Sequence, residues 1–199
     1  FDKQTGSIIK YIDKKTGENL VNDKVYNGFK YIEEDTERGM TAWRIGRLMN
    51  VRQFDSVYLY PINYSADQIR KAIGMRVSFG RSKLNVEAYL DEGSKVLRYQ
   101  VMCDWYEVGR EGYIPQLAYM ISPSHKIKES KRDIPAGVLE HEQIDMALPA
   151  NSFIASVPDK GNMGLMLSTD SRYGYRCYDG ELSVDLLRNP TFPDSCPEY

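Results

Sequence analysis

Apolar and polar residues alternate over residues 173–186, on both sides of the pair Asp179-Gly180. Asp-Gly is typical of a two-residue type I′ turn, because both central positions of that turn need a positive φ. The turn pairs Cys177 with Leu182, Tyr175 with Val184, and Tyr173 with Leu186. All six side chains then share one face, since side chains alternate along a strand. The pattern predicts a β-hairpin that Pro190 and Pro193 end, because proline cannot donate to a ladder.

Residues 68–105 carry a second alternating pattern. Gly80-Arg81 suits a two-residue II′ turn, which takes glycine first. That turn pairs Phe79 with Ser82, Val77 with Leu84, Met75 with Val86, and Ile73 with Ala88. The odd positions of 97–105 are apolar as well, so a third strand follows. A three-stranded antiparallel meander with one apolar face must cover that face, and a second sheet is the economical cover.

The remaining strand signals are shorter. Asp-Lys-x-Thr-Gly turn signals at 2–6 and 13–17 flank a short apolar run. Strands are expected over 7–12, 29–33, 57–62, 113–120, 153–157 and 163–167. No long stretch has the 3.6-residue period of a helix. We therefore expect an all-β fold, an antiparallel β-sandwich, formed as a single domain over residues 1–199.

The composition of the chain argues against nucleic acid and membrane as partners. A formal net charge of −2 gives no reason to expect nucleic acid. No run approaches the ~20 apolar residues of a membrane span. Cys103, Cys177 and Cys196 are too few for a disulfide framework, so we expect free thiols in a reducing, cytoplasmic compartment. The chain opens on turn and strand chemistry without an initiator methionine, as a piece of a longer protein would.

Few residues carry recognisable chemistry. Trp43, among polar neighbours, is either a sugar-stacking platform or a core or seam residue, and the second reading is favoured. Asp104 and Glu107 flank Trp105 and are expected to be structural charges rather than a catalytic pair. His125 and His141 have no His-x-Asp or HExxH pattern around them, so no zinc site is expected in this chain.

Several segments resemble glycoside hydrolase family 38 α-mannosidases. Asp170-Ser-Arg-Tyr-Gly-Tyr175, with Leu186-Leu-Arg-Asn-Pro-Thr-Phe-Pro-Asp194, is similar to the family's late "N-D-S-K-Y-G-Y … L-L-R-S-P-T-Y-P-D" region. Residues 134–142 are similar to its "D-I-P-x-G-V-x-E-R", and 104–107 to its "D-W-x-E". Residues 39–47 resemble a segment of the bacterial branch.

The resemblance implies both fold and role. It places the chain in the C-terminal β-region of the family, a supersandwich of the galactose-mutarotase type. It implies a parent enzyme that hydrolyses α-mannosides with retention, through an aspartate nucleophile and a divalent metal, usually zinc. Those residues belong to a preceding catalytic domain. We therefore expect this chain to be non-catalytic, to hold no metal, to pack on the catalytic domain of the same polypeptide, and to complete one edge of the α-mannoside pocket.

Five residues near the last hairpin are the candidates for substrate binding: Asp170, Arg172, Tyr173, Tyr175 and Arg188. Tyrosine and arginine give a polar, stackable wall for a pyranose. However, the predicted register puts both tyrosines on the apolar face, which favours core packing for them. The two arginines, at the open end of the hairpin, are the better candidates for reaching outward.

Two other classes of function stay open. A stand-alone carbohydrate-binding sandwich would need an exposed row of aromatic residues. A mutarotase-type epimerase would need a positioned acid–base pair. His141 with Glu140 could supply one, but adjacent strand residues point to opposite faces.

Overall fold

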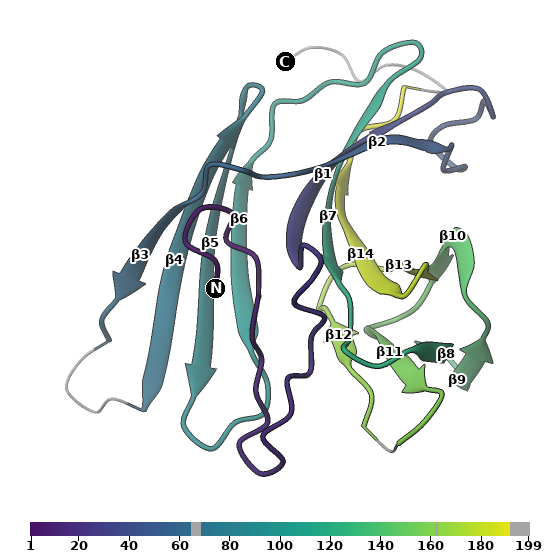
Figure 1. Ribbon diagram of the computed structural model, residues 1–199. Coiled ribbons are helices and arrows are strands. Elements are labelled where there is room, and N and C mark those ends of the chain that lie inside the picture. The colour runs from purple at the N-terminus through teal and green to yellow at the C-terminus, as the bar shows by residue number, and fades with distance from the viewer. Residues whose placement is uncertain (65–68, 162, 192–199) are drawn as a thin grey trace. The chain divides into compact units, whose positions relative to one another are not determined.

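The computed structural model describes residues 1–64, 69–161 and 163–191 (Figure 1). Within these residues every element is a β-strand and every pairing is antiparallel, as the all-β prediction requires. No helix of the described chain is long and apolar enough to cross a membrane. Pro193, Asp194 and Cys196 lie outside the described residues.

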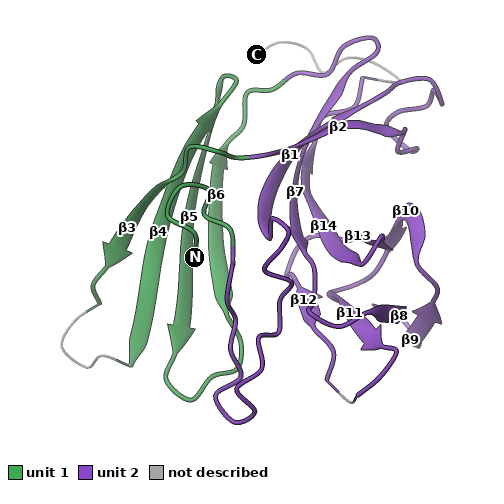
Figure 2. Cartoon of the chain, viewed as in Figure 1, with its two compact units in different colours: residues 1–7, 54–107 green, residues 8–53, 108–199 purple. Residues whose placement is uncertain are grey.

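The chain forms two compact units (Figure 2). Unit 1 comprises Phe1–Ser7 and Phe54–Glu107; unit 2 comprises Ile8–Gln53 and Val108–Tyr199. The single-domain expectation for residues 1–199 stays a prediction.

Unit 1 contains one four-stranded sheet in the order β3-β4-β5-β6. Its strands are β3 (Tyr58–Ile62), β4 (Arg70–Phe79), β5 (Ser82–Asp91) and β6 (Arg98–Asp104). All four pairs predicted across Gly80-Arg81 are present. One face buries Met75, Leu84, Val86 and Ala88. The turn chemistry and the apolar alternation therefore specify the same register.

Unit 2 is built on a six-stranded sheet in the order β10-β13-β14-β7-β1-β2. The strands are β1 (Gly28–Glu34), β2 (Leu48–Gln53), β7 (Ile114–Ile121), β10 (Ile144–Pro149), β13 (Gly174–Tyr178) and β14 (Glu181–Arg188). The order brings together strands that are far apart in the sequence. Residues 28–34 of the N-terminal part pair with β7, which pairs with β14 at the C-terminal end.

The last hairpin has the predicted register between Tyr175 and Glu181. Asp179 and Gly180 have φ of 50° and 74°, as a type I′ turn demands. The prediction is wrong at its open end. β13 begins at Gly174 and the β13–β14 ladder ends at the pair of Tyr175 with Val184, so Tyr173 and Leu186 do not pair. The pairing of β14 with β7 shifts register between Asp185 and Leu187, and such an irregularity changes the direction of the β14 side chains there.

A second sheet of unit 2 has the order β12-β11-β8-β9. Its strands are β8 (Ile127–Ile134), β9 (Gly137–His141), β11 (Phe153–Pro158) and β12 (Met166–Ser168). β11 contacts β13 and β14, so the two sheets of unit 2 form two layers. The buried Tyr175 hydroxyl bonds the Thr169 hydroxyl at 2.7 Å, just beyond β12. This layered arrangement confirms the sandwich class.

The expected strand over 7–12 does not form a ladder. Gly6 N donates to Asp2 O at 3.0 Å and Gly17 N to Asp13 O at 2.7 Å, so both flanking turns are confirmed. Between them, Tyr11 N donates to the Asn19 side chain rather than to a neighbouring strand. Backbone pairing is limited here to isolated bonds, such as Leu20 N to Tyr11 O at 2.9 Å, and the Asn19 side chain supplements them.

Candidate functional site

A buried ion pair lies at one end of the six-stranded sheet. Arg188, at the end of β14, donates from Nε to Glu34 Oε2 at 2.8 Å and from Nη2 to Oε1 at 2.6 Å. The Glu34 side chain is fully buried. Gln116 on the intervening strand β7 donates to the same carboxylate. A buried carboxylate is tolerated only when donors satisfy it, and this one receives them from two other strands.

The same guanidinium fixes the loop between β1 and β2. Arg188 Nη1 donates to Thr41 O at 2.5 Å, and Nη2 to Arg44 O at 2.9 Å. Gly46 N donates to Glu34 Oε1 at 2.5 Å. The loop anchored in this way displays Trp43, which is 66% exposed. The core interpretation of Trp43 is therefore wrong within this chain, while the seam interpretation stays a prediction.

A second loop, residues 169–173, adjoins the end of β14. Arg172 Nε donates to Leu186 O at 2.6 Å, and its Nη1 donates to Ser171 O at 2.8 Å. Thr169 Oγ1 donates to Arg172 O at 2.9 Å. Tyr173 is 62% exposed and Asp170 is exposed as well. The loop is held along β14 and presents a phenol and a carboxylate to solvent.

The division of the five predicted substrate residues into buried and exposed side chains therefore differs from the prediction. Tyr175 is buried, as its register predicts. Tyr173 is not on the apolar face, because the ladder ends before it. Arg188 does not reach outward; it turns inward to Glu34. Arg172 keeps part of its exposure but bonds backbone carbonyls. Asp170 and Tyr173 are the members that face solvent.

Glu34 and Gln116 are absent from the sequence predictions although they organise this end of the sheet. The sequence does contain a signal that the Glu34 side chain is buried. Glu34 has the same parity in its strand as Ile32, which is 1% exposed, so alternation places its carboxylate on a buried face. A charge at such a position requires a partner, but the identity of the partner follows only from the strand order.

Asp185 lies close to this ion pair on β14. Burial raises the pKa of its carboxyl to about 6, although the nearby Arg176 and Arg188 guanidinium groups lower it. The Glu34 carboxylate raises it further. Gly174, which faces Asp185 across the hairpin, has no side chain; an added Cβ would lie 2.9 Å from Asp185 Oδ2. The acid thus occupies space that glycine leaves open.

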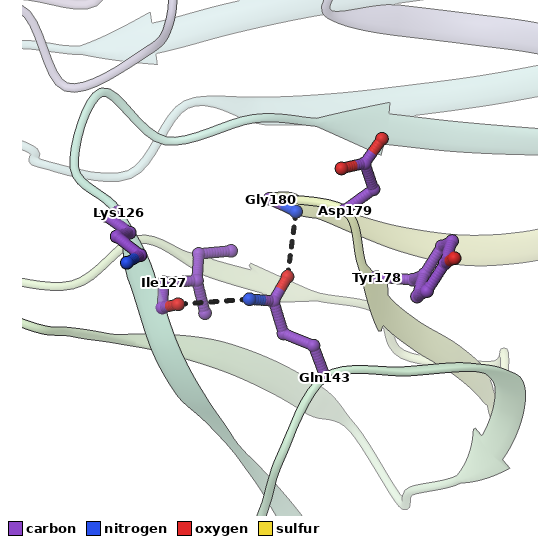
Figure 3. A pocket seen from close by; sticks show the side chains of 6 residues that line it. All are labelled: Lys126, Ile127, Gln143, Tyr178, Asp179 and Gly180. Atoms are coloured by element: carbon purple, nitrogen blue, oxygen red, sulfur yellow. Dashed lines mark hydrogen bonds between the residues drawn. The ribbon is translucent and has the colours of Figure 1, made fainter.

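A separate cavity of about 420 Å³ lies at the turn end of the same hairpin (Figure 3). It is lined by Lys126, Ile127, Gln143, Tyr178, Asp179 and Gly180. Gln143 bridges the opening, donating to Ile127 O at 3.0 Å and accepting from Gly180 N at 2.8 Å. Both polar groups of this amide are engaged, so it serves to position the turn. None of the predicted substrate residues lines this cavity.

Within the part of the chain that the structure describes, neither histidine belongs to a cluster of metal ligands. His125 Nε2 bonds Ser156 Oγ at 2.9 Å, and burial lowers the pKa of His125 while Asp159 opposes that shift. His141 Nδ1 bonds Glu142 O at 2.7 Å. Glu140 pairs instead with Lys131 at 2.7 Å, which does not favour an epimerase acid–base pair. Among residues 1–64, 69–161 and 163–191, no three His, Cys, Asp or Glu side chains come together to hold a metal.

The acids beside Trp105 are also explained locally. Glu107 accepts from Arg81 N at 2.7 Å and from Ser82 Oγ at 2.9 Å, so it caps the β4–β5 turn of unit 1. Asp104 is exposed, at the end of β6. This agrees with the structural interpretation of the pair.

The described residues thus form an all-β sandwich in which an aromatic-bearing loop is fixed over a buried ion pair. The profile of the "Glycosyl hydrolases family 38 C-terminal domain" matches residues 1–196. The chain therefore belongs to glycoside hydrolase family 38, as its C-terminal domain. No curated protein matches the sequence.

Proposed function

We propose that the chain is the non-catalytic C-terminal β-domain of a retaining, metal-dependent α-mannosidase acting on terminal α-mannosides in the cytoplasm. In this proposal the zinc or other divalent metal and the aspartate nucleophile belong to the catalytic domain of the same polypeptide. No three candidate ligands converge in the described part of this chain, so the proposal draws the metal ligands from the catalytic domain. The family match supports the proposal, because it assigns nearly the whole chain to a C-terminal domain.

The observation that carries the proposed role is the anchoring of two exposed loops at one strand end. Arg188 holds the loop that displays Trp43, and Leu186, two residues earlier, accepts from Arg172 of the loop that displays Tyr173. Large aromatic side chains exposed on fixed loops are typical of surfaces that a partner covers. We assign Trp43 and Met40, which are 66% and 45% exposed, to contact with the catalytic domain.

Tyr173 and Asp170 are assigned to the edge of the sugar pocket. The Tyr173 ring provides an apolar face for the C–H groups of a pyranose, and the Asp170 carboxylate provides acceptors for its hydroxyls. Neither group takes part in bond cleavage, so each contributes binding that is equal in the ground state and the transition state.

Kinetics of the full-length polypeptide on an activated aryl α-mannoside test this assignment. Tyr173→Ala is expected to raise KM by about 3- to 10-fold with kcat nearly unchanged, as loss of uniform binding requires. Tyr106→Ala is the matched control, because Tyr106 is similarly exposed, at 60%, but lies in unit 1. Residues 1–199 alone, with added zinc, are expected to show no turnover.

Two results would contradict the proposal. Turnover by residues 1–199 at a rate like that of the full polypeptide would place the reaction centre in this chain. Identical KM values for wild type and Tyr173→Ala would remove the loop from the pocket.

A further inference from the structure

The outer face of the unit 1 sheet is rich in tyrosine and arginine. Strand alternation puts Met75, Leu84 and Val86 on the buried face and sends the even-numbered residues of β3 and β4 to the other. We call the latter the tyrosine face. It is formed by Tyr58, Tyr60, Tyr64, Arg70, Arg76, Glu87, Tyr89 and Asp91.

Two of the tyrosines are nearly parallel. Tyr60 pairs with Gly74, and its ring lies against the bare backbone there: a Cβ added to Gly74 would lie 2.2 Å from Tyr60 Cζ. The neighbouring Tyr58 ring is inclined to it by 24°, with centroids 5.6 Å apart. Tyr58 is 65% exposed. Glycine at this strand position thus lets the Tyr60 ring lie flat on the sheet. The neighbouring Tyr58 ring continues the aromatic surface toward solvent.

Arginines border the rings on both sides. The Arg76 guanidinium lies 4.9 Å from the centroid of Tyr60 and has no carboxylate partner among the described residues. The Arg70 guanidinium lies 3.9 Å from the centroid of Tyr89 and bonds Asp91 Oδ1 at 2.6 Å. Stacking on a ring leaves the edge of a guanidinium free to donate. Arg76 therefore offers hydrogen-bond donors beside an aromatic surface.

The chemistry of this face selects a neutral, polyhydroxylated ligand. Ring faces contact the apolar C–H side of a sugar, while guanidinium donors and carboxylate acceptors serve its hydroxyls. Both signs of charge are present, and Tyr64 also bonds the Glu87 carboxylate. A phosphate-rich polymer would require a clear excess of basic residues instead. The face spans strands rather than forming a pocket, which suits a chain of several sugar units.

We propose that the tyrosine face binds a neutral mannose-type oligosaccharide, separately from the loops that carry Trp43 and Tyr173. Tyr58 and Tyr60 form the stacking platform and Arg76 donates to the hydroxyls. The choice of mannose rests on the proposed function; the neutral-glycan chemistry rests on the face itself. The site would hold polymeric substrate near the enzyme without taking part in cleavage.

Native gel electrophoresis of residues 1–199 through gels containing soluble α-mannan tests the proposal. Mannan is expected to retard the wild-type chain, and Tyr58→Ala is expected to weaken this retardation about tenfold, equivalent to one stacking contact. Arg76→Ala should weaken it as well. Tyr58→Phe retains the ring and should behave nearly as wild type, while Tyr106→Ala controls for loss of an exposed tyrosine elsewhere in unit 1.

Other outcomes would overturn the proposal. No retardation by mannan, equal retardation of wild type and Tyr58→Ala, or equal retardation by dextran would each do so. Retardation by polygalacturonate alone would indicate an anion site instead. Thermal melting of each variant confirms folding, and if Tyr58→Ala fails to fold, Arg76→Ala and Tyr58→Phe decide the result. The gel assay measures binding and not hydrolysis. A negative result in the gel would therefore contradict the oligosaccharide site without contradicting the proposed function, which the kinetics test.

Discussion

The two units use charged side chains in opposite ways. In unit 1, Arg70 and Asp91 lie on an outer sheet face with side chains 37% and 29% exposed, beside tyrosine rings. In unit 2, Arg188 and Glu34 have side chains 15% and 0% exposed and hold backbone groups of a loop. Exposed pairs contribute little to stability, whereas removing one partner of a buried pair leaves an uncompensated charge. The exposed charges of unit 1 are therefore available for ligands, whereas the buried charges of unit 2 stabilise the scaffold.

Removing the buried arginine should have the largest effect. Arg188→Met leaves the Glu34 carboxylate buried with only part of its donors, and it releases the carbonyls of Thr41 and Arg44. We expect a loss of about 3–5 kcal/mol in the free energy of unfolding, measured by urea denaturation.

The matched control is Arg52→Ala. Arg52 pairs with Glu33 on the neighbouring strands β1 and β2, but its side chain is 55% exposed. We expect a loss of about 0–1 kcal/mol. Equal losses for Arg188→Met and Arg52→Ala would show that burial does not set the energetic weight of these charges. The double variant Arg188→Met with Glu34→Gln should recover part of the first loss, because it removes the Glu34 charge that Arg188→Met leaves without its guanidinium partner.

Asp185 is a further buried acid of unit 2, and its burial disfavours the charged form of the carboxyl. Its folded pKa of about 6 lies above the ordinary value of 3.8. Between these values the folded state binds the proton more tightly, so stability from this group is complete below about pH 4 and falls as the pH rises to about 6. Asp185→Asn should therefore raise the free energy of unfolding by about 1–3 kcal/mol at pH 7. Denaturation at pH 4.5 should show a smaller gain; an equal gain at both pH values would contradict the raised pKa.

The two hairpin turns should respond alike, since both need glycine in the left-handed region. Gly180 has φ of 74° and Gly80 has φ of 52°. Gly180→Ala should cost about 1–2 kcal/mol, because a Cβ is disfavoured at positive φ. A Cβ at Gly80 would also lie 2.4 Å from the Glu107 carboxylate, so Gly80→Ala should cost at least as much. Thermal melts of the two variants compare them directly, and a stabilised Gly180→Ala would refute the type I′ assignment.

The smallest effect is expected on the outer face of unit 1. The Asp91 side chain holds the pKa of Arg70 above its ordinary value, and Arg70 in turn lowers the pKa of Asp91. Both groups are open to solvent, so Arg70→Ala should leave the melting temperature nearly unchanged at neutral pH. Added salt should change the wild type and the variant equally. A large loss of stability would mean that this face belongs to the scaffold after all.

Strand register is predicted most accurately from the sequence where turn chemistry and alternation act over short distances. The registers across Gly80-Arg81 and Asp179-Gly180 are confirmed because each local signal supports the other. β2, β8, β9 and β10 are missed, since charged residues such as Lys131 and Asp145 interrupt their apolar pattern. Arg188 and Glu34 are separated by 154 residues, so no local pattern could join them. Tyr173 is exposed because the β13–β14 ladder ends at Tyr175, and alternation alone does not predict where a ladder ends.

The bond between Arg188 and Glu34 also orders events during synthesis. β1 leaves the ribosome long before β14 does. The Glu34 carboxylate on β1 therefore gains its Arg188 partner only after the last described strand has been synthesised. Until then the nascent chain can form the unit 1 hairpins but cannot close the end of the long sheet. Maturation of the Trp43 loop is therefore a late step, completed only once nearly the whole domain has emerged.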